Sequence, residues 1–404
     1  MKMFVKTKGD AGVAHVMGMH TRTEAVLSPA LPNVVIADLD GEEAATLRES
    51  SEFEVFDDIQ FQPATIAQFQ GNWWDRQIGR AFGAVPPPWV SKTQADVMGH
   101  NRADQAWFET SGDGVTIAIV DTGVDGSRAD WEPARRSALS YSPSFSTPWE
   151  DAVGHGTMCA AIACASTKDG GDYNGVAPSA TLLSARSTLQ ATDLYLIFQH
   201  LLREYRRGSF PGGLVVSNSY GLYVCSPPSF PAGHPYVDLV RLCVQAGMTF
   251  VFAAGNNHGA GLCNFPAADC GPNTIWTVNS IDEVITVGTV NWDGTNRAPG
   301  EHANSSPGPG QWSTRADKPD VVAPTYGRVA WGGSYEVMEW WGTSGACPQV
   351  AGLAAILLEK RPSLTPNEIR TVVRTTASNP DGHPTSCIGA GIIDCLSAVR
   401  SIVV

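Results

Sequence analysis

Long apolar runs and positive charge are both scarce in this chain of 404 residues. No stretch approaches the ~20 consecutive apolar residues that a membrane-spanning helix requires, so we expect no membrane partner. The 27 Lys and Arg residues are outnumbered by 40 Asp and Glu, which gives a formal net charge of −13. A surface of this sign repels phosphate backbones and anionic lipids, and we therefore expect no nucleic acid partner either.

A secretory signal is missing as well. Residues 1–10 contain three lysines and an aspartate, but no apolar segment of the length that a signal peptide has. This favours a cytoplasmic location. A chain shortened at its start would look the same, and secretion would then be the expectation.

Cysteine is present in an odd number, nine. Cys159, Cys164 and Cys347 lie in apolar segments that favour helices, and we expect them to be buried thiols. Cys263 and Cys270 flank a loop that is short enough to be bridged, but the sequence does not settle any pairing.

The chain has enough apolar material for a full core, at 43% of its residues, and a length that fits one large domain and a small one. Apolar runs typical of strands cover 115–121, 214–219, 249–254 and 284–290, and the pattern over 192–207 predicts an amphipathic helix. Strands that alternate with helices favour a parallel sheet covered on both faces. We therefore expect a doubly wound α/β fold with its site at the carboxyl ends of the strands.

Three polar residues stand where such elements end or begin. Asp121 ends the apolar run of the first of these strands, and His155 stands between two glycines at the start of an apolar helix. Ser344 follows a glycine turn and opens another apolar helix, with Pro348 expected in or near the first turn, where a missing N–H costs little. We expect the serine hydroxyl to be exposed, with the positive end of the helix dipole behind it.

Together these residues form the set that nucleophilic acyl chemistry needs. Serine is a weak nucleophile until a base removes its proton, which His155 can do near neutral pH. Asp121 would fix the tautomer of the imidazole and stabilise the imidazolium. Each residue alone has an ordinary interpretation, as a turn residue, a loop residue or a helix cap. Their joint arrangement favours catalysis by Ser344.

The order Asp, His, Ser and the strings around these residues resemble the subtilisin-type serine proteases, the subtilase family. The resemblance covers most of residues 89–404. The matching strings are Asp121-Thr122-Gly123, Gly154-His155-Gly156-Thr157, Gly175-Val176-Ala177-Pro178, Ala253-Ala254-Gly255-Asn256, Lys318 to Pro324, Gly342-Thr343-Ser344 and Gly389 to Asp394. Each string is weak alone, whereas all of them in one order form a specific signal.

The resemblance implies roles for further residues. Asn256 would donate its side-chain amide to the oxyanion of the tetrahedral intermediate, together with the backbone N–H of Ser344. The alternative is that Asn256 only shapes a turn. The residues that would line an extended peptide, paired by strand addition, are Ser219, Tyr220, Gly221 and Gly255. The chemistry of the family requires no cofactor.

Two features depart from the family pattern. The usual methionine after the nucleophile is replaced by Gly345, which frees the backbone but touches no catalytic atom. Of the residues that often follow the catalytic aspartate in the family, only the acid Asp130, which often binds calcium there, is kept. The loop 168–174 adds Asp169 and Asp172 as oxygen ligands of the type that calcium prefers, so a structural calcium ion is one expectation. Solvated surface acids are the other.

The first part of the chain differs from the rest, as a small separate domain would. Its expected elements are a strand at 34–37, a helix at 41–48 and an alternating strand at 53–61. This pattern resembles the later half of the inhibitory propeptide of subtilases. We therefore expect a propeptide-like inhibitory and chaperone domain at 1–65, a linker with the processing site at 66–88, and a catalytic domain at 89–404. A permanent N-terminal accessory domain is the alternative.

The expected function is that of a serine endopeptidase, made as an autoprocessed zymogen, that hydrolyses peptide bonds through an Asp-His-Ser triad and an acyl-enzyme. Peptides or unfolded proteins are the expected substrates, and the chain's own propeptide is the expected partner. A peptide macrocyclase or transpeptidase is one alternative, because it would use the same triad but deliver the acyl group to an amine. A non-catalytic peptide-binding protein is another, although it would normally have lost a triad residue.

Overall fold

The computed structural model of the chain describes residues 1–19, 25–63, 91–166, 173–258, 263, 270–290, 305–315, 317–338, 341–380 and 382–403. Its strands are β1 (Lys2–Thr7), β2 (Val26–Leu27), β3 (Val34–Asp38), β4 (Phe53–Asp57), β5 (Gln62–Pro63), β6 (Thr116–Asp121), β7 (Thr181–Arg186), β8 (Leu214–Asn218), β9 (Tyr220–Gly221), β10 (Thr249–Ala253), β11 (Ile285–Val290), β12 (Val321–Pro324), β13 (Gly327–Trp331) and β14 (Ser334–Met338). Its α-helices are α1 (Asp10–Met19), α2 (Gly41–Glu49), α4 (Gln94–His100), α5 (Ala103–Ala106), α6 (His155–Cys164), α7 (Ala191–Arg206), α8 (Pro235–Gln245), α9 (Gly342–Lys360), α10 (Pro366–Thr376), α11 (Thr385–Ile388) and α12 (Cys395–Ser401).

The large sheet is parallel and has the strand order β12-β11-β10-β8-β6-β7. The chain enters this sheet at β6, adds β7 on one side, and then crosses to add β8 on the other side of β6. Such a change of direction opens a crevice at the carboxyl ends of the two strands, where α/β proteins place their sites. The expected doubly wound fold is confirmed, and its predicted strands lie within one residue of the observed bounds.

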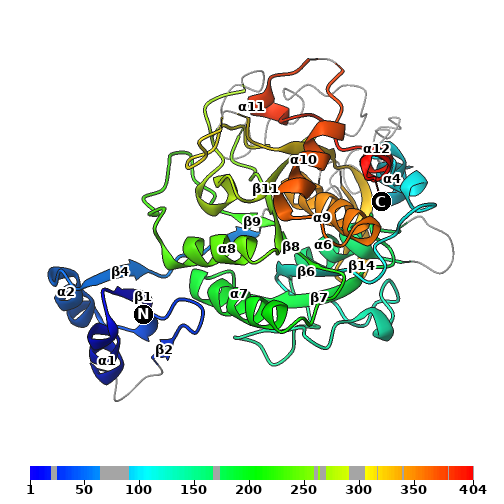
Figure 1. The fold of residues 1–404 in the computed structure, drawn as a ribbon. Coiled ribbons are helices and arrows are strands. Elements are labelled where there is room, and N and C mark those ends of the chain that lie inside the picture. Colours follow the sequence, from blue (N-terminus) through cyan, green and yellow to red (C-terminus); the bar gives the residue numbers. More distant parts are fainter. Residues whose placement is uncertain are drawn as a thin grey trace, which may run out of the picture.

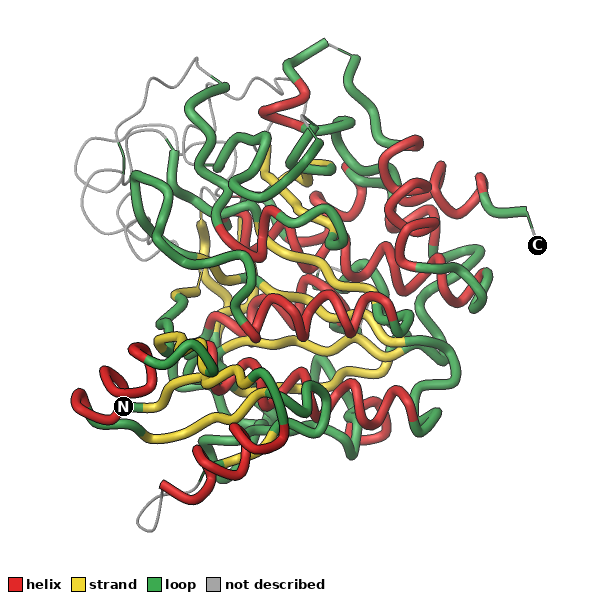
Figure 2. The backbone as a smooth tube through the Cα atoms, turned by 60° about the vertical axis from the view of Figure 1, so that its left-hand side comes forward, coloured by secondary structure: helices red, strands yellow, loops and turns green. Residues whose placement is uncertain are grey.

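Alternate residues of the central strands face opposite helical layers. In β6, Ile117 and Ile119 belong to the core formed with α6 and α9, whereas Ala118 and Val120 belong to the core formed with α7 and α8. All four side chains are buried. Because helices cover both faces, the inner positions of β6 are all apolar, which is why the sequence shows a continuous run there rather than alternation. Figure 2 shows the strands side by side with helices on both sides.

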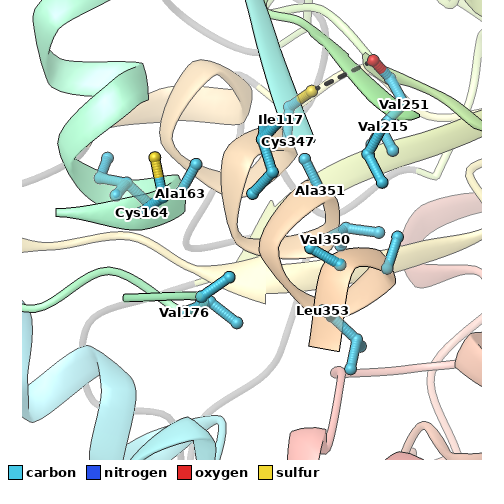
Figure 3. Packing of buried hydrophobic residues seen from close by; sticks show 14 of the residues in the cluster. Ile117, Ala163, Cys164, Val176, Val215, Val251, Cys347, Val350, Ala351 and Leu353 are labelled. Atoms are coloured by element: carbon cyan, nitrogen blue, oxygen red, sulfur yellow. Dashed lines mark hydrogen bonds between the residues drawn. The ribbon is translucent and has the colours of Figure 1, made fainter. Parts of the chain in front are cut away.

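Helix α9 is buried along most of its length. Its glycines allow other elements to come close: a Cβ at Gly352 would lie only 2.6 Å from the Cβ of Val176. Figure 3 shows Cys347 of this helix beside Val251 of β10, and the Cys347 thiol donates to the Val251 carbonyl over 3.5 Å. The core thus fixes the helix whose first turn contains Ser344.

A second, antiparallel sheet of order β2-β3-β1-β4 lies in the first part of the chain, and α1 and α2 share its core. Strand β3, helix α2 and strand β4 agree with the elements expected at 34–37, at 41–48 and at the start of 53–61. The sequence pattern does not foresee β1 or α1. Because β1 lies inside the sheet, between β3 and β4, residues 1–63 form a small α+β unit of their own rather than the later half of one.

This small unit lies against helices α7 and α8 (Figure 1). The Lys6 Nζ lies 3.1 Å from Asp238 Oδ2 on α8. The Asp58 carboxylate accepts hydrogen bonds from the backbone N–H and the hydroxyl of Thr192, at 2.9 and 2.6 Å. Since Thr192 is the second residue of α7, a carboxylate of the small unit caps a helix of the large one.

The end of the small unit then adds a strand to the large one. The Phe61 N–H donates to the Leu189 carbonyl at 2.8 Å, and Phe61 is fully buried. Strand β5 follows directly and pairs antiparallel with β9, which comes after β8 at the edge of the expected site. The last described residues before 91 therefore lie beside the segment expected to line a peptide.

Two disulfides, Cys225–Cys263 and Cys270–Cys387, join distant parts of the chain, each with a Cα–Cα distance of 5.2 Å. A bridge between Cys263 and Cys270 is excluded, because each has another partner. The free thiols are Cys159, Cys164, Cys243, Cys347 and Cys395, all of them buried, as expected for the three that the sequence singles out. Among the described residues, none of the helices combines the length and apolar character needed to cross a bilayer.

Candidate active site

Asp121 and His155 meet at the carboxyl end of β6. Asp121 is the last residue of that strand and His155 is the first residue of α6. The His155 Nδ1 lies 2.7 Å from Asp121 Oδ1, and both side chains are at most 1% exposed. Because a carboxylate can only accept, Nδ1 carries the proton and Nε2 is left as an acceptor. Nε2 is buried and has no hydrogen-bond partner among the described residues, so it can take a proton.

A second carboxylate, Asp151, holds the start of α6. It accepts from the backbone N–H and the hydroxyl of Thr157 in the first turn, at 2.9 and 2.7 Å, and from the hydroxyl of Thr122 at 2.9 Å. Because Thr122 follows Asp121 directly, Asp151 ties the turn after β6 to the helix that begins with His155. The motifs in the sequence do not single out this residue. Its signal is an aspartate just before a helix start, a position where acids cap the free N–H groups.

Ser344 lies in the first turn of α9 and is fully buried, so the prediction of an exposed hydroxyl is wrong for the full chain. Its Oγ donates to the Ser219 carbonyl at 3.3 Å. Pro348 lies inside the helix rather than in its first turn. Since proline lacks the N–H that would otherwise reach the Ser344 carbonyl, that carbonyl accepts from the Ser219 hydroxyl instead, at 3.0 Å.

The thiol of Cys159 touches both parts of this arrangement. Its Sγ lies 3.9 Å from His155 Nδ1 and 3.6 Å from the carbonyl oxygen of Ser344. Asp121, His155 and Cys159 could in principle hold a metal ion, because their ligand atoms lie within 4.8 Å of one another. Burial, however, raises the pKa of the Cys159 thiol well above its usual value, and a protonated thiol is a poor ligand. We therefore interpret Cys159 as a buried thiol that contacts both His155 and Ser344, and not as a metal ligand.

Asn256 lies just after β10 and is held by the residue before Ser344. Its Oδ1 accepts from the backbone N–H and the hydroxyl of Thr343, at 3.1 and 2.8 Å. The Thr343 hydroxyl in turn accepts from the N–H of Gly255 at 3.3 Å. Because Oδ1 is engaged by Thr343, Nδ2 is the side of this amide that can donate near Ser344, and it lies 3.5 Å from the Tyr223 hydroxyl. Asn256 thus binds the residue that precedes Ser344 through Oδ1 and donates from Nδ2 to Tyr223.

The four residues expected to line a peptide lie at two neighbouring strand ends. Ser219 stands between β8 and β9, and Tyr220 and Gly221 form β9 itself. Gly255 has φ +104°, in the left-handed region that favours glycine, and a Cβ there would lie 3.1 Å from Ser306 Oγ. The structure therefore places all four near the start of α9 or on the strand that already pairs with β5.

Gly345 makes room for a buried tryptophan. A Cβ at this position would lie 2.6 Å from the Cβ of Trp341 and 3.1 Å from its Cε3. Trp341 is fully buried, and its Nε1 donates to the Gly327 carbonyl at 2.9 Å. A methionine after Ser344 would collide with this indole, which explains the departure from the family pattern.

The predicted calcium ligands divide into two groups. Asp169 and Asp172 lie outside the described residues. Asp130 is buried, its Oδ2 accepts from Arg128 Nε at 2.6 Å, and its Oδ1 accepts from the Tyr335 hydroxyl at 2.9 Å. A guanidinium thus already neutralises this carboxylate, and Asp130 does not fit the role of a calcium ligand.

Comparison with known proteins decides the family. The model of the subtilase family matches residues 112–391, a range that contains Asp121, His155 and Ser344. The chain belongs to the subtilase family. Subtilases are serine proteases, and by this membership the chain is a hydrolase of peptide bonds.

Several curated subtilases are similar to this one. Mycosin-1 of Mycobacterium tuberculosis is 31% identical over 348 residues, which cover 78% of this chain and 74% of mycosin-1. A calcium-dependent protease of Trichormus variabilis is 30% identical over 340 residues, covering 74% of this chain but only 47% of that protein. Serine protease AprX of Bacillus subtilis is 26% identical over 317 residues, covering 72% and 67%. The chain thus spans about half the length of the calcium-dependent protease.

Two solved structures share the fold. The crystal structure of fervidolysin from Fervidobacterium pennivorans, described as a keratinolytic enzyme, has a TM-score of 0.66 at 22% identity and covers 99% of this subtilase and 60% of fervidolysin. MycP1 of the ESX-1 type VII secretion system has a TM-score of 0.56 at 21% identity and covers 78% and 87%. The likeness to fervidolysin therefore extends over the small N-terminal unit, and a MycP1 structure is described with its N-terminal propeptide removed.

Proposed function

We propose that this subtilase is a serine endopeptidase in which Ser344 is the nucleophile, His155 the general base and Asp121 the residue that orients His155. The observation that carries the proposal is the buried Asp121–His155 pair, 2.7 Å apart at the topological switch point of the sheet. The described part of the chain offers no hydrogen-bond partner to His155 Nε2. The shared contact with Cys159 supports the placing of Ser344 next to this pair.

In the proposed reaction, His155 Nε2 takes the proton of Ser344 Oγ while that oxygen attacks the scissile carbonyl carbon. For this step the Ser344 hydroxyl turns from the Ser219 carbonyl toward Nε2, a rearrangement typical of sites whose hydrogen bonds tighten only with substrate. The imidazolium, stabilised by Asp121, then gives its proton to the leaving amine. Water hydrolyses the acyl-enzyme by the same route, and Asn256 Nδ2 with the Ser344 N–H donates to the oxyanion.

We further propose that residues 1–63 belong to an inhibitory propeptide, as part of the domain expected at 1–65. Their last strand, β5, lies antiparallel on β9, with Gln62 opposite Gly221 and Pro63 opposite Tyr220. Ser219 directly precedes Tyr220 in the chain, and its carbonyl and hydroxyl both contact Ser344. The pairing of β5 with β9 therefore supports a cut shortly after Pro63, within the expected range of residues 60–90.

The same register supports a side-chain preference. Phe61 is fully buried, and its ring centroid lies 5.7 Å from that of Tyr220, 6.1 Å from Phe230 and 5.4 Å from Tyr236. If β5 occupies the place of a bound peptide, substrates with an aromatic residue at the position of Phe61 gain the same contacts, since aromatic pairs of this geometry contribute about 0.5–1.5 kcal/mol beyond burial.

A mixed peptide library with products read by mass spectrometry tests this function. We expect hydrolysed products enriched in an aromatic residue at the position of Phe61. Cyclised or ligated products would establish the macrocyclase or transpeptidase alternative. The absence of any turnover would favour a non-catalytic peptide-binding protein.

The propeptide proposal has its own test, the intact mass of the purified chain. We expect the wild type to lose about 7 kDa of its 42.9 kDa, whereas Ser344→Ala stays at full length. An uncut wild-type chain with full activity would instead establish the permanent accessory domain.

A structural calcium ion remains a proposal for the rest of the chain, supported by the similarity to proteases named calcium-dependent. An ion that binds only the folded state raises the melting temperature as its concentration rises. We expect EDTA to lower the melting temperature and calcium to restore it. The Asp130→Asn variant should show the same response to EDTA and calcium, because Asp130 is bonded to Arg128 and Tyr335 and not to the ion. An unchanged melting curve after EDTA would contradict calcium binding.

The cytoplasmic location also remains a proposal. The two disulfides argue for an oxidising compartment instead, because structural disulfides are rare in reducing cytosol. Localisation of a tagged chain by fractionation decides between the two.

A further inference from the structure

A tryptophan outside the expected constellation faces the catalytic histidine. Trp331 ends β13, and its ring centroid lies 6.1 Å from that of His155 at an interplanar angle of 85°. The same indole fills the space beside the preceding residue: a Cβ at Gly154 would lie 2.7 Å from Trp331 Nε1 and 2.8 Å from Cδ1. A glycine directly before His155 is therefore what lets the indole come close.

The turn that follows Trp331 is held by a buried ion pair. Arg128 donates to the Gly332 carbonyl at 2.8 Å and to Asp130 at 2.6 Å, and its guanidinium lies 4.7 Å from the Tyr335 ring centroid. Tyr335 also donates its hydroxyl to Asp130. These contacts join the turn and strand β14 of the β13–β14 hairpin to the segment that follows Asp121.

The other end of the hairpin is fixed as well. The backbone N–H of Arg328 donates to the Lys92 carbonyl at 2.8 Å, and the Gly327 carbonyl accepts from the buried Trp341 indole. With both ends held, the hairpin has little freedom to move Trp331 away from His155.

We propose that Trp331 is a positioning residue for the general base, and that the Arg128–Asp130–Tyr335 cluster holds it in place. This inference rests on the proposed role of His155. An edge-to-face aromatic contact on one side and the Asp121 carboxylate on Nδ1 leave His155 one ring orientation, the one that presents Nε2 to the serine. The indole also covers this side of the imidazole, which keeps water from competing for the Nδ1 proton.

Asp130 has a structural role in this proposal. The acid that the sequence pattern marks as a calcium ligand instead accepts from Arg128 and Tyr335, and so supports the hairpin. Removing the Tyr335 hydroxyl would then weaken the placement of Trp331 without touching any atom near the reaction.

The rate of inactivation by a phosphonofluoridate tests the proposal, because it reports the reactivity of Ser344 without a peptide that Trp331 could also touch. We expect Trp331→Ala to lower this rate and kcat by about 10- to 100-fold, the range that a small misplacement of a catalytic group produces. KM stays within about twofold. Trp331→Phe keeps a ring against His155 and restores most of the rate, whereas Trp331→Leu, which keeps apolar bulk only, does not.

Two further variants show which part of the hairpin affects the inactivation rate. Tyr335→Phe is expected to lower the rate in the same direction but less, and Arg328→Ala, whose side chain is exposed on the same hairpin, leaves it unchanged. The low-field proton resonance of the His155 Nδ1–H is expected in wild type and is broadened by solvent exchange in Trp331→Leu. This signal is read without turnover.

The outcomes separate this inference from the function it rests on. Labelling of wild type at Ser344 with equal rates and equal proton signals in the Trp331 variants would overturn the positioning role alone. A raised KM with an unchanged inactivation rate would make Trp331 a substrate contact and would equally overturn it. No labelling of wild type at Ser344 would overturn both.

Discussion

Among single residues, the proposed nucleophile Ser344 is held through its own backbone carbonyl. Pro348 removes one N–H from α9, and the Ser344 carbonyl that would have received it is bound by Ser219 instead. Because Ser219 lies between the two strands β8 and β9, Ser344 is connected to the segment that pairs with β5. A proline inside a helix usually costs about 3 kcal/mol, but here it leaves the Ser344 carbonyl available to Ser219.

The amide of Asn256 leads to the first prediction. Asn256→Ala is expected to lower kcat by about 10²–10³ with little change in KM, a magnitude known from the corresponding loss in subtilisin itself. Steady-state kinetics on a peptide substrate measure it. Asn256→Asp is the matched control, because it keeps the oxygen that accepts from Thr343 but has no N–H to donate. If the aspartate restored turnover, anchoring of Thr343 and not oxyanion binding would be the role of Asn256.

The sequence alone predicts the identity of several of these residues, since each stands at the end of a distinct apolar run. Asp121, His155 and Asn256 lie where the pattern puts them, at strand ends and a helix start. Trp331 is not predicted, because its contact with His155 spans 176 residues of chain and no local pattern encodes it. The position of Asp151 before a helix predicts a cap, but its hydrogen bond to Thr122, 29 residues away, is not visible in the sequence.

At the scale of elements, the start of α9 is shaped by what packs against it. Gly345 is expected to be intolerant of any side chain, since a Cβ would approach Trp341 to 2.6 Å. Gly345→Ala should therefore lower the free energy of unfolding by about 1–3 kcal/mol, the usual cost of overpacking a core. Urea denaturation measures it. Gly18→Ala in α1 is the control, because nothing lies within 4 Å of the added Cβ, and it should be neutral or slightly stabilising. Equal effects of both substitutions would refute the steric account.

The elements of the large sheet are predictable because burial on both faces demands continuous apolar runs. Strand β1 and helix α1 are not, because Lys2, Lys6 and Thr7 interrupt the apolar residues of β1 and Gly12 and Gly18 weaken the helical pattern of α1. Their stability comes from the shared core with β3 and α2, which includes Val5. Such tertiary support is not visible in a local stretch of sequence.

At the scale of the whole molecule, the small N-terminal unit and the large one meet around a buried histidine. His234 begins α8, and its ring lies against Phe4 and Phe56 of the small unit at centroid distances of 4.8 and 5.3 Å. Its Nε2 donates to the Asp57 carbonyl at 3.2 Å, and its Nδ1 accepts from the Tyr236 N–H at 3.1 Å. The sequence gives this histidine no special setting, because its neighbours come from another part of the chain.

Burial lowers the pKa of His234 to about 4, because the imidazolium would lose its hydration in this apolar contact. As pH falls below about 6.5, His234 is protonated in the unfolded chain but stays neutral in the folded one. The free energy of unfolding therefore decreases between roughly pH 6.5 and 4. In a Ser344→Ala background, which excludes self-cleavage, His234→Gln should lower the melting temperature at pH 7.5. That difference should shrink toward pH 4.5, since glutamine does not titrate. A difference that stays constant across this range would contradict the assignment.

The cysteine pairing is also a property of the whole molecule. Cys225 pairs over 38 residues and Cys387 over 117, so only the folded chain brings the partners together. Spacing along the sequence suggests the nearest bridge, between Cys263 and Cys270, and is misleading here because both belong to loops that meet other segments.

We propose that Ser344, activated by His155 and Asp121, performs nucleophilic catalysis. Incubation with a phosphonofluoridate followed by peptide mapping tests this role, with Ser344→Ala as the control. We predict a single covalent adduct on Ser344 in wild type and none in the variant, together with a loss of turnover on the order of 10⁶, as in subtilisin itself. An adduct on another residue, or a Ser344→Ala protein with wild-type turnover, would contradict the account.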